Sequence, residues 1–216
     1  MLPAHAMSRP AEIFGLFPTP LMHAPACLDA PLVATLLAHP DGAGQTVNSH
    51  SSQLSHSRIL APNSDALLAC ATTLVMPHLS AFGAMLFGES LDWSIKEIWA
   101  NFLQAGGQQA MHNHANCFIS GVLYLSAVDA SASTVFTKGP GGRDYVFGNS
   151  GERVSLNAFN ADKWVAPEVA PGDLVLFPSY LLHEVPPNRG GLRITLAFNA
   201  IPSRLEPWGY GISLSA

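Results

Sequence analysis

The feature that most constrains the fold is a series of short apolar segments in the second half of the chain, from Leu91 onward. Gly and Pro turn signals separate most of these segments. Short apolar runs bounded by turn residues are typical of β-strands. We expect eight strands, at Ile95–Leu103, Gln108–His114, Phe118–Ser126, Thr134–Thr137, Trp164–Val169, Asp173–Pro178, Leu182–Val185 and Leu192–Asn199. This number of short strands predicts a mainly β domain, a double-sheet jelly roll or double-stranded β-helix.

The chain before Leu91 has a different pattern. Asp29 can cap a short helix with apolar residues along one face from Leu32 to Leu37. Asn63-Ser64-Asp65 is a second helix start signal, and the apolar residues after it predict one or two helices, broken or kinked near Pro77 and ended by Gly88. We expect these N-terminal helices to pack against the jelly roll.

The whole chain of 216 residues is long enough for one domain with a sizeable core. We expect residues 1–90 to form an extended edge segment, the helices and a surface loop at 41–63, residues 91–200 the jelly-roll core, and residues 201–216 a tail. The Gly-rich stretch at 139–163 is either a lid over the site or an ordinary insertion.

Composition excludes several kinds of protein. Hydrophobic residues make up 48% of the chain and charged residues 12%, which excludes a disordered chain. The net charge of −5 and the absence of a basic run argue against nucleic acid or an anionic membrane as the main partner. Three cysteines without a CxxC pair favour a reducing compartment. Because Pro77, His78 and Ser80 interrupt the most apolar stretch and no signal peptide is evident, we expect a soluble cytoplasmic protein, with a homodimer left open.

Three histidines lie where a metal site is expected. His112 and His114 are two residues apart directly before an apolar run, and residues i and i+2 of a strand point to the same face. His183 lies in a later apolar segment and can supply a third ligand. Imidazole suits Fe, Zn, Cu and Ni alike, so the ligands alone do not name the metal. We expect six histidines not to be ligands: His5, His23, His39, His50, His56 and His78.

Polar residues inside the other predicted strands are candidates for binding a cosubstrate. Arg193 is costly in an apolar strand unless it meets an anion, and its planar fork suits a carboxylate; a structural salt bridge is the alternative. The Tyr124 hydroxyl either assists at the same anion or bonds to backbone within the core. Asn101 shares a strand face with Trp99 and either orients a ligand or satisfies the sheet.

At these residues the chain resembles the Fe(II)- and 2-oxoglutarate-dependent oxygenase superfamily, above all the small 2OG-Fe(II) oxygenases of bacteria and phages. The layout is also similar to that of prolyl hydroxylases. The resemblance extends over most of the chain, and its motifs are specific together but weak one by one. They are Leu16–Pro20, Trp99-x-Asn101, His112-Asn113-His114, Ser120–Leu125, Gly172–Ser179, His183-Glu184-Val185 and Arg193-Ile194-Thr195.

The resemblance implies that His112 and His183 bind Fe(II), and that Arg193 and Tyr124 hold the far carboxylate of 2-oxoglutarate. His114 falls where the superfamily has a carboxylate ligand. It either completes a three-histidine site or leaves that position to water. The implied reaction consumes O2, converts 2-oxoglutarate to succinate and, by default, hydroxylates a substrate. A small molecule, a peptide or a protein side chain would all serve as that substrate.

Two other functions fit the same residues. One is a cupin-like three-histidine dioxygenase that does not use 2-oxoglutarate, in which Arg193 binds the substrate itself. The other is a jelly-roll binding module without catalysis. Polar residues that point into a barrel argue against the module, because an empty polar cavity is expensive.

Overall fold

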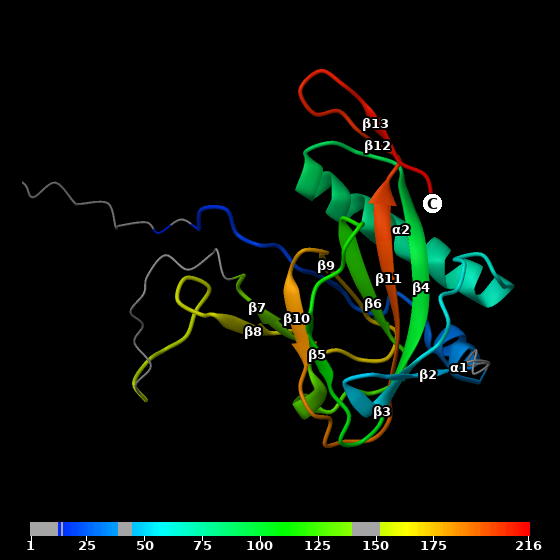
Figure 1. Ribbon diagram of the computed structural model, residues 1–216, viewed down its shortest axis with the longest axis vertical. Helices are drawn as coiled ribbons and strands as arrows, with labels where there is room; N and C mark the ends of the chain where they lie inside the picture. Colours follow the sequence, from blue (N-terminus) through cyan, green and yellow to red (C-terminus); the bar gives the residue numbers. More distant parts are fainter. Residues whose placement is uncertain (1–12, 14, 39–44, 140–151) are drawn as a thin grey trace, which may run out of the picture.

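The protein is described by a computed structural model that covers residues 13, 15–38, 45–139 and 152–216. Two antiparallel β-sheets face each other, and the helices lie on the outer side of the larger sheet (Figure 1). The predicted jelly-roll class is therefore confirmed. Residues 140–151 of the predicted lid or insertion lie outside the described residues, so its role stays a prediction.

All eight predicted strands are present, with small changes in their bounds. The larger sheet has the order β1 (Met22–Ala24), β9 (Leu174–Pro178), β6 (Ile119–Tyr124), β11 (Arg193–Pro202), β4 (Trp93–Leu103), β3 (Ser51–His56) and β2 (Thr46–Asn48). The smaller sheet has the order β5 (Gln109–His112), β10 (Leu182–Val185), β7 (Val135–Thr137) and β8 (Lys163–Val165). A separate hairpin, β12 (Arg204–Leu205) with β13 (Ile212–Ser213), follows β11.

Alternation along β4 separates the core from the site. Ile98, Ala100 and Phe102 belong to the main apolar core beneath the helices. Trp99 and Asn101 point the other way, toward the smaller sheet, because successive side chains of a strand face opposite sides. Strand β11 alternates in the same manner. The larger sheet therefore has one face for the core and one for the site.

The helix predictions hold, except for a break at Pro77. Helix α1 (Ala30–Ala38) begins at Asp29, whose Oδ1 accepts from the Leu32 amide at 2.8 Å. Helix α2 (Ala66–Phe87) begins with the Asp65 cap and ends at Gly88, which has the left-handed φ of 71°. Of the predicted one or two helices, broken or kinked near Pro77, the structure has one, and α2 is not broken at Pro77. Its buried stripe of Leu68, Ala71, Val75, Leu79 and Phe82 packs on the sheet on both sides of the proline, and this burial outweighs the roughly 3 kcal/mol that a helical proline costs.

Helix α2 is also long and apolar enough to cross a membrane by length and composition, the one such helix in the described part of the chain. About two fifths of the qualifying window, 39%, is buried within the protein. Core helices of soluble proteins pass the same test. The cytoplasmic location stays a prediction.

The structure differs from the sequence-based expectation in two further places. The predicted loop at 41–63 contains the hairpin β2–β3, and β3 pairs with β4 in the register Leu54↔Leu103 and His56↔Asn101. Strand β5 ends at His112, so His114 lies in the turn that follows and not in the predicted strand. Both differences affect the residues around the site.

Candidate metal and cosubstrate site

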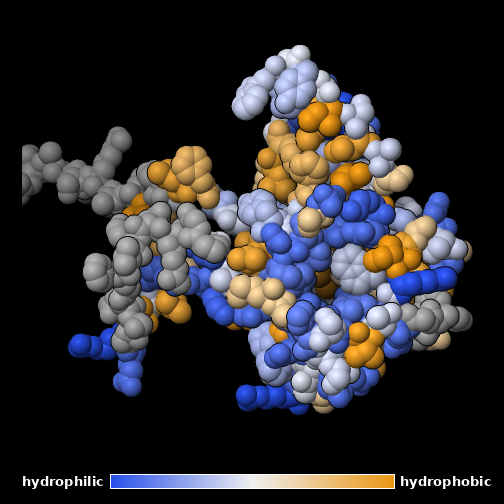
Figure 2. Space-filling model, viewed as in Figure 1, coloured by the Kyte–Doolittle hydropathy of each residue, from blue (hydrophilic) through white to orange (hydrophobic). Residues whose placement is uncertain are grey.

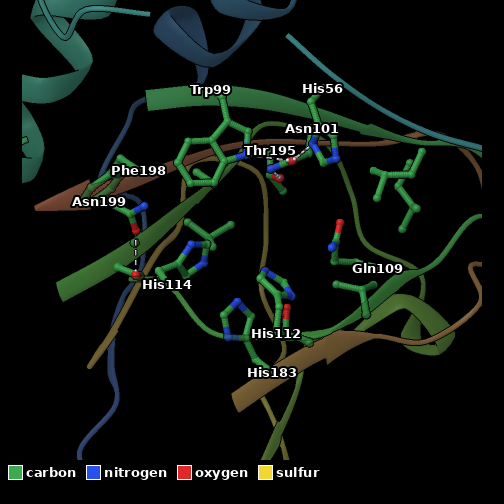
Figure 3. A pocket seen from close by; sticks show the side chains of 18 of the residues that line it. His56, Trp99, Asn101, Gln109, His112, His114, His183, Thr195, Phe198 and Asn199 are labelled. Carbon is green, nitrogen blue, oxygen red and sulfur yellow. Dashed lines mark hydrogen bonds between the residues drawn. The ribbon is translucent and has the colours of Figure 1, made fainter. Parts of the chain in front are cut away.

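A cavity of about 390 Å³ lies between the two sheets. In Figure 2 a hollow opens at this place, with hydrophilic side chains around its rim. Figure 3 shows its two sides: histidines from the smaller sheet below, and Trp99, Asn101 and Thr195 from the larger sheet above. A concave site of this size, with polar groups converging in it, is typical of small-molecule binding.

His112, His114 and His183 converge at one end of this cavity. His112 and His183 face each other across the β5–β10 pair, and their ring centroids are 4.2 Å apart. The His114 ring lies 5.1 Å from each of the other two. One nitrogen from each ring lies within 4.8 Å of the others. With small side-chain rotations, one ion at the usual distance of about 2.0–2.1 Å can contact all three.

Hydrogen bonds fix the tautomers of two of these rings. His112 Nδ1 is 2.8 Å from the Ala110 carbonyl oxygen, and His183 Nδ1 is 2.9 Å from the Leu181 carbonyl oxygen. Because a carbonyl only accepts, each Nδ1 carries the proton and donates it. Each Nε2 therefore keeps a free lone pair, which is the arrangement found in metal-binding histidines.

The three imidazoles are neutral at neutral pH. Burial, with a smaller contribution from the neighbouring His112, lowers the pKa of His183 to about 3. Burial, again with a contribution from His112, lowers the pKa of His114 to about 4. Burial also lowers the pKa of His112. Neutral imidazole is the form that binds a metal, so protons do not compete for this site near pH 7.

The turn after β5 brings His114 back toward the other histidines. Its backbone amide donates to the Ser179 carbonyl at 3.0 Å, and the Ser179 hydroxyl donates to the Cys117 carbonyl at 2.6 Å. Asn116, with a φ of 58°, makes the reversal. The predicted convergence of His112 and His114 is therefore found, but a turn held by Ser179 produces it and not the alternation of a strand.

Arg193 lies in the same cavity and is 5% exposed. Among the described residues it forms no ion pair with a carboxylate; Nη2 lies 3.5 Å from the Thr134 hydroxyl, and Nε has no hydrogen-bond partner. Burial lowers the pKa of its guanidinium, and Tyr124 opposes this shift. The alternative of a structural salt bridge thus finds no support in the described residues. A buried cation without a carboxylate partner is costly, and an anionic ligand would relieve that cost.

Tyr124 and Asn101 lie beside Arg193 in different ways. The guanidinium carbon of Arg193 is 5.3 Å from the centroid of the Tyr124 ring, and Tyr124 is 2% exposed. Asn101 lines the cavity. Its Oδ1 accepts from Trp99 Nε1 at 3.1 Å, and its Nδ2 donates to the Thr195 hydroxyl at 3.3 Å. Asn101 therefore orients groups around the site.

His56 is a site residue that the sequence did not reveal. Its Nδ1 is 2.7 Å from Asn101 Oδ1, and its Nε2 is 3.1 Å from Asn48 Nδ2. The amide nitrogen of Asn48 donates to Nε2, so Nδ1 carries the proton and donates to Asn101. His56 lies outside the group of three histidines, and its bond fixes the orientation of Asn101.

Comparison with known families agrees with this geometry. The profile of the family described as "Putative 2OG-Fe(II) oxygenase" matches residues 97–199, from β4 to β11. The match spans 103 residues, a little under half of the 216-residue chain. It indicates a 2OG-Fe(II) oxygenase, an oxidoreductase that depends on Fe(II) and 2-oxoglutarate. No curated protein sequence matches it.

Solved structures share the fold of this chain at low identity. A 2OG-Fe(II) oxygenase family protein from Burkholderia pseudomallei is 18% identical, with 84% of each chain covered and a TM-score of 0.58. The epimerase SnoN of nogalamycin biosynthesis is 15% identical, with 86% and 80% covered and a TM-score of 0.64. HygX from Streptomyces hygroscopicus, solved with nickel and 2-oxoglutarate, is 13% identical, with 86% and 84% covered and a TM-score of 0.60. These likenesses establish the jelly-roll fold.

Proposed function

We propose that this oxygenase binds one Fe(II) ion through His112, His114 and His183, and the far carboxylate of 2-oxoglutarate through Arg193. The observation that carries the proposal is the pairing of two features in one cavity. Three neutral imidazoles converge at one end, and a buried guanidinium without a carboxylate partner among the described residues lies in the same space. Three histidines alone would fit several metals, and a buried arginine alone would fit many anions. Together they fit a metal and a dicarboxylate.

The donor set fits iron. Imidazole nitrogens suit Fe, and three ligands on one face leave other positions open for cosubstrate and O2. When bound, the metal activates O2 while 2-oxoglutarate is decarboxylated to succinate. The side chains of the oxygenase hold the reactants: the Nδ1–H bonds of His112 and His183 keep both rings aimed into the cavity, and Arg193 sets the direction of the cosubstrate.

A histidine at position 114 changes the charge of the site. The superfamily's carboxylate ligand would leave Fe(II) with one positive charge, whereas three neutral imidazoles leave it with two. A more positive metal favours binding of the 2-oxoglutarate dianion, and Arg193 adds to this attraction. We therefore infer that His114 is a ligand, and that the metal binds the dianion more strongly than it would with a carboxylate at position 114.

The substrate we propose is a small molecule. A cavity of about 390 Å³ fits a metabolite better than it fits part of a folded protein. Two proteins of the same fold support this: HygX was solved with hygromycin B bound, and SnoN with nogalamycin RO. Hydroxylation is the outcome that we propose by default. The absence of a nucleic-acid or membrane partner, and a homodimer, stay predictions.

The test of this function is stoichiometry of turnover. Protein loaded with Fe(II) should consume O2 and form succinate only when 2-oxoglutarate is present, in equal amounts of both. The Arg193→Gln variant should lose most of this turnover. O2 uptake without succinate would contradict the proposal and favour the three-histidine dioxygenase that does not use 2-oxoglutarate.

A further inference from the structure

The inner face of the larger sheet carries its polar side chains in separate rows across the strands. Each row crosses β4, β11 and β6. In order along β11, the rows are Glu97–Asn199–Ser120, Trp99–Ala197–Val122 and Asn101–Thr195–Tyr124. Arg193 lies beyond the third row. Asn199 and Arg193 are six residues apart on β11, which separates their backbones by about 20 Å. The carboxylate of Glu97 and the guanidinium of Arg193 thus lie at opposite ends of the cavity.

Glu97 is held in place by two buried polar side chains. Asn199 Nδ2 donates to Glu97 Oε1 at 2.8 Å, and the Ser120 hydroxyl donates to Asn199 Oδ1 at 2.8 Å. Asn199 is 3% exposed and Ser120 is 2% exposed. Figure 3 shows this Asn199 bond next to His114. Two buried groups therefore fix the direction of one carboxylate on the cavity wall.

The second oxygen of this carboxylate is available to a ligand. Among the described residues, Glu97 Oε2 has no hydrogen bond, and Lys96 approaches only Oε1, at 3.4 Å. Both side chains of that ion pair are partly exposed, so it contributes little. A surface ion pair of this kind does not explain why buried Asn199 and Ser120 hold Glu97 on the cavity side.

An aromatic ring lies beside the same end of the cavity. The Trp99 ring centroid is 5.8 Å from that of His114, and Trp99 Nε1 is tied to Asn101. The face of an indole attracts a cation, as does a carboxylate. Glu97 and Arg193 are the two lining residues, apart from histidines, with ionisable side chains. Since Arg193 serves the anionic cosubstrate in the proposed function, Glu97 remains for the substrate.

We propose that the substrate carries a protonated amine, which pairs with Glu97 and lies against Trp99 at the His114 end of the cavity. This inference rests on the proposed function and specifies the substrate class of the same site. Binding of the amine there would place a neighbouring C–H group near the metal, while the cosubstrate extends away toward Arg193.

The test compares matched amines and alcohols by ligand-observed NMR. The protein is loaded with Mn(II) and 2-oxoglutarate, and the probes are benzylamine against benzyl alcohol and cyclohexylamine against cyclohexanol. Mn(II) broadens the signals of a probe only when the probe binds near the metal. In the unmodified protein, we expect each amine to bind at least about tenfold more tightly than its alcohol, a difference of about 1.4 kcal/mol.

The preference should disappear in Glu97→Gln, which keeps an oxygen for Asn199 to bond but removes the charge. It should persist in Glu89→Gln, which removes an exposed carboxylate that pairs with Arg204 and does not line the cavity. An unchanged thermal unfolding midpoint would show that Glu97→Gln is folded. Equal binding of amines and alcohols, no binding of either, or a preference that survives in Glu97→Gln would overturn the inference.

A separate measurement distinguishes failure of the proposed function from failure of the amine subsite. A calorimetric titration of 2-oxoglutarate into the Mn(II)-loaded protein reports on the metal and Arg193, without an amine in the Glu97 subsite. If 2-oxoglutarate binds and the amines show no preference, the amine subsite is wrong and the oxygenase proposal stands. If 2-oxoglutarate does not bind, the oxygenase proposal itself is contradicted.

Discussion

Replacing Arg193 by methionine should weaken cosubstrate binding without harming the fold. In the ligand-free protein this guanidinium is 5% exposed and has no carboxylate partner among the described residues. Exchange of buried charges for apolar groups of similar volume is often neutral or stabilising by about 1–4 kcal/mol. We therefore expect the free energy of unfolding of the ligand-free protein to stay the same or rise in Arg193→Met.

The effect on 2-oxoglutarate should be large. A bidentate pair contains two charge-assisted hydrogen bonds of about 1.5–3 kcal/mol each, so its loss should cost about 3 kcal/mol or more. That corresponds to an increase in Kd of about 100-fold or more. Calorimetry on the Mn(II)-loaded protein measures this change, and urea unfolding of the metal-free protein measures stability. The exposed Arg189→Met is the matched control and should change neither.

The opposite pair of results would show that Arg193 does not bind the cosubstrate. If Arg193→Met lowered the free energy of unfolding by more than about 2 kcal/mol, a loss typical of a structural contact, and left the affinity for 2-oxoglutarate unchanged, the guanidinium would be a structural group. Its partner would then have to lie in the protein, and the cosubstrate assignment would fail with it.

Single features of the site and the fold give three more predictions. His114→Ala should weaken Co(II) binding by more than the 10- to 100-fold typical of groups that only orient a ligand; a smaller loss in a metal titration would mean that His114 does not bind the metal. Gly121→Ala would place a Cβ 2.1 Å from Phe198 Cζ and should lower the free energy of unfolding in urea by about 1–3 kcal/mol, whereas Gly191→Ala, with open space, should not. Acidification should destabilise the metal-free protein: the folded pKa values of about 3 for His183 and about 4 for His114 lie below the ordinary value of about 6.5, so the unfolded chain binds more protons and stability falls as the pH drops through 6.5 toward 3. A thermal unfolding midpoint equal at pH 7.5 and pH 5 would contradict this.

The strands that form the jelly roll could be predicted because each contains an apolar run with turn residues beside it. The hairpin β2–β3 could not, because its apolar anchor is Leu54, 2% exposed, among serines and histidines. Its contribution to the sheet comes from pairing with β4, which local sequence does not encode. His56 was missed as a site residue for the same reason.

The site could be predicted only as far as residue types and spacing reveal it. An arginine within an apolar strand and a histidine pair before one are visible in the sequence, and the structure brings them to one cavity. The route of His114 into the site was not visible, because it depends on Ser179, which lies 65 residues away and bonds to the turn after β5. The same holds for Glu97, whose direction depends on Asn199 on the neighbouring strand.

The central claim is that three imidazoles hold one metal ion and Arg193 completes a site for 2-oxoglutarate. An anaerobic titration of Fe(II) and 2-oxoglutarate tests it most directly, by the visible metal-to-ligand charge-transfer band that forms when the cosubstrate chelates iron. We predict a band that saturates at one Fe(II) per chain, is lost in His183→Ala and Arg193→Ala, and is retained in His78→Ala. No band in the unmodified protein, or an equal band in His183→Ala, would contradict the account.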